Sequence, residues 1–237
     1  MDFSQKFKLA KDYFLDLIFP KFCVGCNLEG EWICQNCHNK IVMVATQVCP
    51  DCNRISAHGR YCVKCRKKHR LSGIIVITYY EEGPIKEAIH NLKYNNVTEL
   101  GDFLGKMMVG PLKDNLNIIN DKVILTAVPM HFLRQAQRGY NQSEILANII
   151  GNELKIEKNF KIIKKFRKTK SQVKFSGKKR RENLKNSFKI IDKNTVKNRT
   201  VIIVDDVTTT GATLEECAKV LREAGVKRVW GLVVARG

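Results

Sequence analysis

The sequence predicts an α/β protein with a small, cysteine-rich N-terminal domain and a larger domain built on a doubly wound, mostly parallel sheet. Three observations support this. Eight of the nine cysteines fall within residues 23–65, in Cys-x-x-Cys pairs. After Leu71, apolar strand patterns alternate with amphipathic helix patterns, as in parallel sheets. The 237 residues are enough for two domains of this kind, and we expect them to span 1–70 and 71–237.

The composition is that of a globular protein, with 44% hydrophobic and 27% charged residues. Only 15 Gly and 5 Pro exclude a collagen-like or low-complexity chain. No apolar run approaches the ~18 residues of a membrane helix, so we expect no membrane span. Residues 1–20 form an amphipathic helix pattern that contains Asp12 and Asp16, a poor signal peptide. We therefore expect a cytoplasmic protein with reduced thiols, which are available to bind metal.

The cysteine pairs have the spacing of zinc knuckles. They are Cys23 and Cys26, Cys34 and Cys37, Cys49 and Cys52, and Cys62 and Cys65. Two such pairs complete a tetrahedral four-sulfur shell around Zn²⁺, which leaves no open position for catalysis. We predict two structural zinc sites, paired either sequentially or with the first knuckle joined to the third. His58 and His69 are superfluous as ligands and are expected at the surface, and Cys217 is expected in the core.

The second domain is predicted element by element from its periodicity. Strands are expected at 72–80, 123–129, 199–207 and 226–235, and helices at 84–94, 141–154 and 213–225. In the first of these helices, Ile85, Ala88, Ile89 and Leu92 share one face. Asn141 is placed to cap the second helix, with Glu144 three residues later.

Residues 201–213, VIIVDDVTTTGAT, contain a predicted phosphate site. An apolar strand ends in Asp205 and Asp206, and a threonine-rich loop then leads into a helix. Loop N–H groups, threonine hydroxyls and the helix N-terminus can converge on an anion, and Gly211 allows a close approach. The two carboxylates would repel a phosphate but suit neutral hydroxyls or a divalent metal beside it. Hydroxyls next to a phosphate indicate a ribose 5-phosphate.

Positive charge is concentrated in one segment. The formal net charge is +19, and between Lys155 and Arg199 the basic residues outnumber the acidic ones by eighteen to three. Residues 164–185 are the densest part, with Phe166 and Phe175 among the cations, as stacking on single-stranded bases would require. The expected polyanion contacts are Lys168, Lys170, Lys174, Lys178, Lys179, Arg180 and Arg181. Either nucleic acid or a polyphosphorylated metabolite fits this charge.

The motif at 201–213 resembles the phosphoribosyl-pyrophosphate (PRPP) signature of type I phosphoribosyltransferases. Together with the cysteine pairs, it is similar to the ComF family of competence-associated proteins, which join a double zinc ribbon to a type I phosphoribosyltransferase-like domain. The resemblance covers nearly the whole chain, because the blocks at 79–94, 128–142 and 167–188 follow in the order that this family uses.

The resemblance assigns roles to individual residues. It implies that Asp205 and Asp206 hold the ribose 2′- and 3′-hydroxyls and that PRPP binds with Mg²⁺. It places the pyrophosphate at the turn 128–131, and it makes residues 167–181 a flexible hood loop. The expected PRPP-binding residues are Val128, Pro129, Met130, His131, Arg134, Arg138, Asp205, Asp206, Val207, Thr208, Thr209, Thr210, Gly211, Ala212 and Thr213. We expect His131 to be a structural hydrogen bonder.

Two functions follow from the resemblance. The first is a binding protein for PRPP, or a phosphoribosyl nucleotide, and single-stranded DNA in DNA uptake and natural transformation, with a helicase-like competence ATPase as an implied partner. The alternative is a type I phosphoribosyltransferase that transfers the pentosyl group of PRPP to a nitrogen acceptor and releases pyrophosphate. Only 26 residues follow Gly211, and no base-recognition pattern is visible, so we rank binding first.

Overall fold

The computed structural model describes residues 20–119, 122–169 and 177–237. The predicted N-terminal helix lies outside these residues, as do Lys170, Lys174 and Phe175. None of the described helices is both long and apolar enough to cross a membrane.

A five-stranded sheet of parallel strands forms the centre of the molecule, in the order β1-β7-β6-β2-β3. The strands are β1 (Gly73–Tyr79), β2 (Val123–Ala127), β3 (Glu157–Lys158), β6 (Thr200–Thr208) and β7 (Arg228–Arg236). A separate antiparallel pair joins β4 (Ile163–Lys165) to β5 (Phe188–Ile190). The predicted mostly parallel sheet is confirmed.

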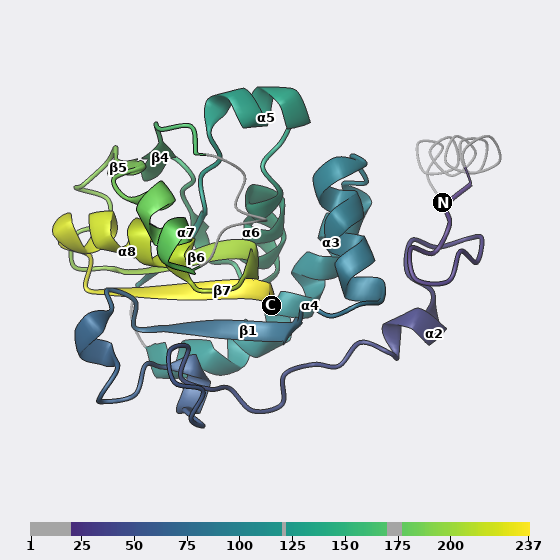
Figure 1. The fold of residues 1–237 in the computed structure, drawn as a ribbon, viewed down its shortest axis with the longest axis horizontal. Helices are drawn as coiled ribbons and strands as arrows, with labels where there is room; N and C mark the ends of the chain where they lie inside the picture. The colour runs from purple at the N-terminus through teal and green to yellow at the C-terminus, as the bar shows by residue number, and fades with distance from the viewer. Residues whose placement is uncertain (1–19, 120–121, 170–176) are drawn as a thin grey trace.

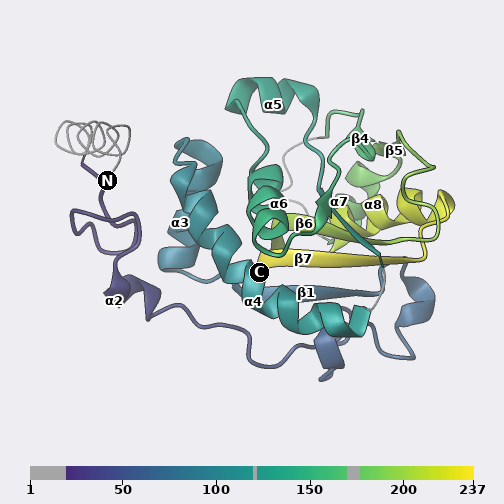
Figure 2. The same cartoon turned by 180° about the vertical axis from the view of Figure 1, so that it is seen from behind.

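Helices cover both faces of this sheet (Figures 1 and 2). One face packs against α3 (Pro84–Tyr94), α4 (Glu99–Ile119) and α6 (Gln142–Glu153), and the other packs against α8 (Ala212–Glu223), beside α7 (Gly177–Leu184). Side chains alternate between the faces along each strand. In β6, Ile202 and Val204 therefore pack on the side of α3, α4 and α6. Val201 and Ile203 pack on the side of α8. This is the doubly wound arrangement that the sequence predicts.

The predicted elements are found within two residues of their expected ends. Helix α3 has the predicted bounds, and its four expected apolar residues are all buried. Asn141 caps α6, because its side chain accepts a hydrogen bond from the backbone N–H of Ser143. Cys217 is fully buried, as expected.

Helix α4 was not predicted, because its three glycines and Pro111 disfavour a helix. Tertiary packing overrides that preference. Gly101 and Gly105 face α6, and a Cβ added at either position would press on Ile145 or Ile149. The small residues thus bring the two helices together, and propensity alone gives no sign of this.

The cysteine segment forms two small units. The first contains α2 (Gln35–His38) and lies beside α3, whereas the second contains the short 3₁₀ turns η1 (Ala57–Gly59) and η2 (Arg66–Lys68) and lies along β1 (Figure 1). Cys49 and Cys65 of the second unit belong to the same hydrophobic cluster as the sheet and α8.

Candidate functional site

A cleft with a volume of about 590 Å³ opens at the carboxyl ends of β2 and β6. Its walls are the turn 128–131, helix α5 (Phe132–Arg138), the end of α3 and the loop from β6 to α8. Parallel sheets bind ligands at this edge. All fifteen residues that were expected to bind PRPP line the cleft. The structure also adds residues to which sequence analysis gave no ligand-binding role: Tyr80, Lys93, Tyr94, Leu133, Gln137, Asn141, Gln142, Ser143, Lys165 and Thr169.

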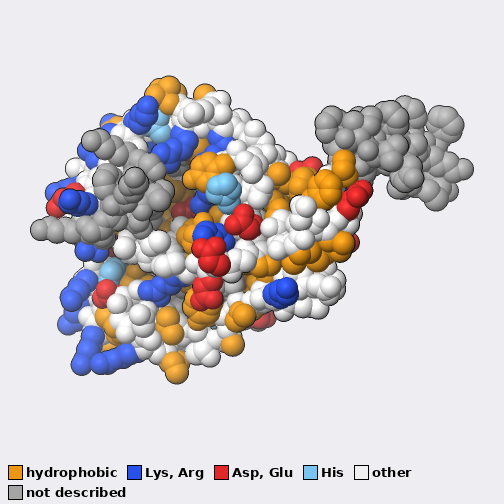
Figure 3. Space-filling view, turned by 45° about the vertical axis from the view of Figure 1, so that its right-hand side comes forward, with side chains coloured by type: hydrophobic (Ala, Val, Ile, Leu, Met, Phe, Trp, Pro, Cys, Tyr) orange, Lys and Arg blue, Asp and Glu red, His pale blue; other side chains and the backbone are white. Residues whose placement is uncertain are grey.

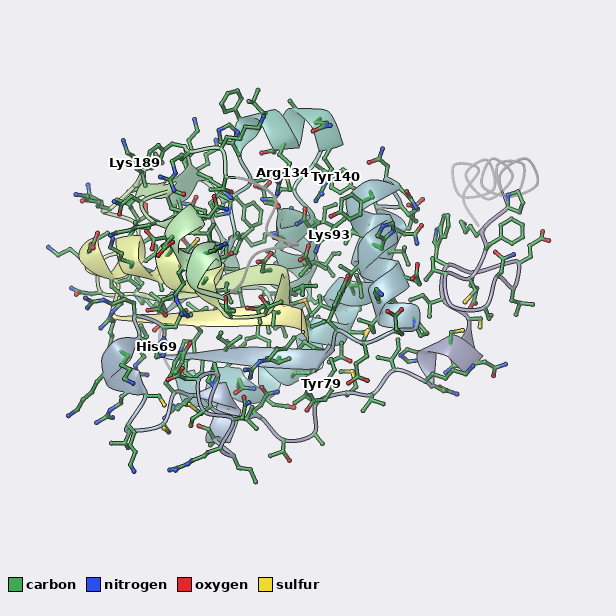
Figure 4. The ribbon with its side chains drawn as sticks, in the orientation of Figure 1. His69, Tyr79, Lys93, Arg134, Tyr140 and Lys189 are labelled. Carbon is green, nitrogen blue, oxygen red and sulfur yellow. The ribbon has the colours of Figure 1, made fainter. Side chains whose placement is uncertain are left out.

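Two adjacent carboxylates lie on the floor of this cleft. Asp205 Oδ1 accepts hydrogen bonds from Ser143 Oγ (2.8 Å) and from the backbone N–H of Asp206 (3.0 Å). Asp206 Oδ1 is 2.8 Å from the ammonium of Lys93, which reaches the cleft from α3 (Figure 4). The other oxygen, Asp206 Oδ2, is buried and has no hydrogen-bond partner within the described part of the chain. A buried acceptor of this kind suits a ligand that brings a hydroxyl donor.

Burial and mutual repulsion set the charges of this acidic pair. Burial, followed by the neighbouring charge of Asp206, raises the pKa of Asp205 to about 7, although Lys93 and Ser143 act against the shift. Burial alone would lower the pKa of Lys93, but the charge and hydrogen bond of Asp206 outweigh it and raise that pKa above its usual value. Lys93 therefore keeps its positive charge beside Asp206, 2.8 Å from Oδ1.

The threonine loop leads directly into α8. Gly211 is the N-cap residue of that helix, with φ of 70°, and makes no side-chain capping bond. The first N–H groups of a helix without such a cap remain available to an anion. On its far side, the loop borders a smaller cavity of about 40 Å³, lined in part by Gln47 and Ile74. The loop thus separates the cleft from the segment between the two cysteine groups.

Helix α5 carries the arginines that were expected to contact anions. Arg134 is exposed at the cleft, and the guanidinium of Arg138 lies 5.4 Å from the ring centre of Tyr94 and donates to Gln142 Oε1 (2.6 Å). Figure 4 shows Arg134 and Lys93 between α5 and α3. His131 is buried and caps α5 by accepting from the backbone N–H of Leu133. Its hydrogen bond is structural, as expected.

The basic segment contributes to the site unevenly. Lys168 lines the cleft, whereas Lys179 and Arg181 are exposed on α7. The side chains of Lys178 and Arg180 are not described. Phe166 is partly exposed, and the ammonium of Lys189 lies 4.4 Å from its ring centre. Most of the Lys and Arg side chains visible in Figure 3 lie on its left half.

The eight expected metal ligands form two groups of four. Cys23, Cys26, Cys34 and Cys37 make up the first group, and Cys49, Cys52, Cys62 and Cys65 the second, with the sulfurs of each group within 4.8 Å of one another. The knuckles therefore pair sequentially. In each group a backbone N–H donates to the first sulfur, from Cys34 to Cys23 and from Cys62 to Cys49, both at 3.4 Å. Four converging thiolates with such donors fit a structural Zn²⁺.

The segment of the second group contacts α8, the helix that follows the threonine loop. Glu215, in the first turn of α8, accepts from the backbone N–H groups of Arg70 and Leu71. His69 lies between Asp51 and Glu215, 3.5 and 3.6 Å from their carboxylates, and stacks on Tyr61 at 4.0 Å. The expectation of a surface role for His69 was therefore wrong: its side chain is partly buried and joins the cysteine group to α8.

Comparison with known proteins agrees with this architecture. A family model described as a double zinc ribbon domain matches residues 14–66, and one described as a phosphoribosyl transferase domain matches residues 140–236. Among solved structures, the glutamine PRPP amidotransferase from B. subtilis is similar, with 19% identity over 56% of this chain and 25% of that one, at a TM-score of 0.36.

Three curated proteins match most of the chain. Competence protein F from Haemophilus influenzae is 31% identical and covers 90% of this chain and 96% of its own. DNA utilization protein YhgH from Escherichia coli K12 is 28% identical over 91% and 98%. Competence protein ComFC from Bacillus subtilis is 26% identical over 82% and 80%. The fold and matches define a class in which a double zinc ribbon precedes a phosphoribosyltransferase-type domain. Within that class, the chain belongs to the competence protein F (ComF) family.

Proposed function

We propose that the protein binds PRPP or a phosphoribosyl nucleotide in the cleft, and single-stranded DNA along its basic segment, in a competence-related handling of DNA. The observation that carries the first part is the buried Asp206 Oδ2, which has no hydrogen-bond partner among the described residues and belongs to the same cleft as the uncapped start of α8. One side of the cleft thus offers acceptors for sugar hydroxyls, and the other offers donors for a phosphate. The names of the relatives, which refer to competence and DNA utilization, support the second part.

The cations around the cleft extend the site beyond a monophosphate. Arg134 and Arg138 come from α5, and Lys165 and Lys168 from the opposite wall. Burial, followed by the charge of Arg134, lowers the pKa of Lys165, which favours an anion between the two walls. A diphosphate with Mg²⁺ fits between these walls. The eight thiolates hold two structural Zn²⁺ ions and take no part in binding the diphosphate.

Titration calorimetry with PRPP and Mg²⁺ tests the cleft. Asp205→Asn together with Asp206→Asn should weaken binding at least ~10-fold, because the hydroxyls lose their charged acceptors. The matched control is Asp102→Asn with Asp114→Asn on α4, which removes the same charge far from the cleft. Wild-type affinity should also fall as the pH drops below about 7, where Asp205 takes up a proton. Unchanged affinity in the cleft variant would refute the assignment.

Salt dependence tests the DNA contact. On a single strand, log K against log[salt] changes by ~0.7 per neutralised phosphate. Replacing Lys178, Lys179, Arg180 and Arg181 by Ala should flatten the slope by up to about 2–3 units if all four contact phosphate. The control removes the same charge elsewhere, with Lys40, Lys86, Lys106 and Lys113 changed to Ala, and should leave the slope unaltered. A wild-type protein that ignores single-stranded DNA at low salt would contradict this function.

Catalysis is the second candidate, because the cleft has room for a diphosphate beyond the ribose site. In that reaction the bond from C1 of the ribose to pyrophosphate breaks and a bond from C1 to an acceptor nitrogen forms. The acceptor's proton passes to solvent or to pyrophosphate. Pyrophosphate release from PRPP, screened against nitrogenous bases and amines, distinguishes the two candidates. Tight PRPP binding without any release supports the binding function.

A further inference from the structure

Lys93 differs from the other cations of the cleft in its surroundings. Arg134 is exposed, whereas the Lys93 side chain is only 20% exposed and ends 2.8 Å from Asp206 Oδ1. It is carried by α3, which is fixed to the sheet by the fully buried Ile89 and Leu92. The ammonium is therefore held in place beside the acidic pair before any ligand arrives.

The ionisable groups near Lys93 are few. Asp206, Asp205 and Tyr94 influence its protonation, and all three line the same cleft. Two neighbouring carboxylates in a buried site repel each other, and one of them ordinarily takes a proton or shares a cation. In this site the pKa of Asp205 is raised to about 7, and Asp206 contacts the ammonium of Lys93. The protein thus supplies, through Lys93, the positive charge beside the two carboxylates.

That charge lies 2.8 Å from Asp206 Oδ1, where a divalent ion shared by the two carboxylates would have to lie. Mg²⁺ needs oxygen ligands at about 2.0–2.1 Å in octahedral geometry. Asp206 Oδ1 is already engaged by the ammonium, and a metal at that oxygen would meet a second cation at close range. Asp206 Oδ2, for which the described part of the chain offers no hydrogen-bond partner, can accept from a sugar hydroxyl without help from a metal.

We propose that Lys93 takes the place of a divalent cation at the acidic pair, so that the ribose half of the cleft binds a 5′-phosphorylated ribose without metal. This inference rests on the proposed PRPP or nucleotide site and narrows it. Mg²⁺ is then needed only for the diphosphate of PRPP, and ligands with a single 5′-phosphate, such as ribose 5-phosphate or a nucleoside monophosphate, bind equally well in its absence.

A salt bridge with a purely structural role makes a different prediction. It would lower stability when broken but would leave the metal dependence of binding unchanged. The metal dependence of ligand affinity in Lys93 variants therefore separates the two roles, and a stability measurement alone does not.

The experiment is titration calorimetry with ribose 5-phosphate, once in excess EDTA and once in millimolar Mg²⁺. For the wild type the two dissociation constants should agree within about threefold. Lys93→Gln should bind at least ~10-fold more weakly in EDTA and recover most of that loss with Mg²⁺. Lys93→Arg should behave as the wild type, because it keeps the charge. The matched control is Lys86→Gln. Lys86 is a surface lysine seven residues before Lys93, on the same side of α3, and it pairs with Glu82.

Thermal melting checks that each variant is folded. If Lys93→Gln is unstable because Asp206 loses its partner, Lys93→Gln combined with Asp206→Asn removes both charges and is tested instead. This double variant should bind ribose 5-phosphate weakly, with or without metal, because the charged acceptor is gone.

The failures are distinguishable. If wild-type binding of ribose 5-phosphate requires Mg²⁺, or if Lys93→Gln binds as well as the wild type in EDTA, the metal-free site is refuted while PRPP binding stands. If neither PRPP with Mg²⁺ nor ribose 5-phosphate binds, the proposed function itself is wrong.

Discussion

The two four-cysteine groups offer the same ligands to a metal but have different surroundings. In the first group, the cysteines form a small cluster of their own, and neighbours such as Trp32 and Ile33 make the contact with α3 and α4. In the second, Cys49 and Cys65 are themselves part of the core under the sheet. Equal metal chemistry therefore does not imply an equal structural role. The second group is part of the framework that holds the threonine loop, whereas the first is attached to that framework.

The largest effect is expected from a matched pair of ligand substitutions, Cys49→Ser and Cys23→Ser. Both sulfurs are buried and accept one backbone N–H. Cys49→Ser should lower the free energy of unfolding of the sheet by about 3 kcal/mol or more, because a metal site and core packing are lost together. Cys23→Ser should lower the free energy of unfolding of the sheet by less than about 1 kcal/mol, because the loss of structure stays within the first cysteine group.

The chain itself provides the probes for this comparison. It has two tryptophans, Trp32 in the first cysteine segment and Trp230 in β7. Urea unfolding followed by fluorescence in a Trp32→Phe background reports on the sheet alone. Native mass spectrometry should count two zinc ions in the wild type and one in each variant. Equal destabilisation by both substitutions would remove the distinction between the groups.

A second pair of variants tests how closely the second group lies on the sheet. Gly59 and Gly30 both have positive φ, 69° and 119°, so alanine is strained at either position. A Cβ at Gly59 would also overlap the carbonyl oxygen of Ile74 in β1, whereas the space at Gly30 is open. Gly59→Ala should therefore cost about 2 kcal/mol more than Gly30→Ala in urea unfolding. Similar losses of stability in the two variants would mean that β1 moves aside easily to make room for the added Cβ.

The smallest effect is expected at the contact between the second group and α8. Glu215→Gln weakens the acceptor for two backbone N–H groups and removes an acidic residue from the first helical turn, at a cost of about 1 kcal/mol. Glu223→Gln, exposed on the same helix, is the control and should change stability by less than about 0.5 kcal/mol. The comparison uses equilibrium unfolding at low salt, and the effect should shrink as salt is added.

The sequence predicts best those parts of the site that are contiguous in the chain. The acidic pair, the threonine loop and the cysteine knuckles each lie within a few residues, so their spacing carries the chemistry. Lys93 and Ser143 reach Asp206 and Asp205 from helices that are distant in the sequence, and only the packing of α3 and α6 brings them there. The block 79–94 had been singled out by resemblance, and it contained the only signal for Lys93.

The pairing of knuckles and helix α4 were beyond sequence analysis for a similar reason. Both possible pairings satisfy the same ligand spacing, and the choice depends on where each knuckle packs. In α4, the glycines that argue against a helix are the residues that let it approach α6. Local preference and tertiary contact conflict there, and the contact prevails.

At its Gly211 end, beside the smaller cavity, the loop between β6 and α8 is backed by protein, because Ile74 and Tyr61 lie within 4 Å of a Cβ built at Gly211. The loop therefore cannot retreat from the cleft without disturbing β1 and the second cysteine group. Under the proposed function, a phosphate meets a binding surface that is already formed, and little ordering entropy is lost on association. The association rate should be governed by diffusion into a cationic cleft, and it should fall with ionic strength without a slow conformational phase.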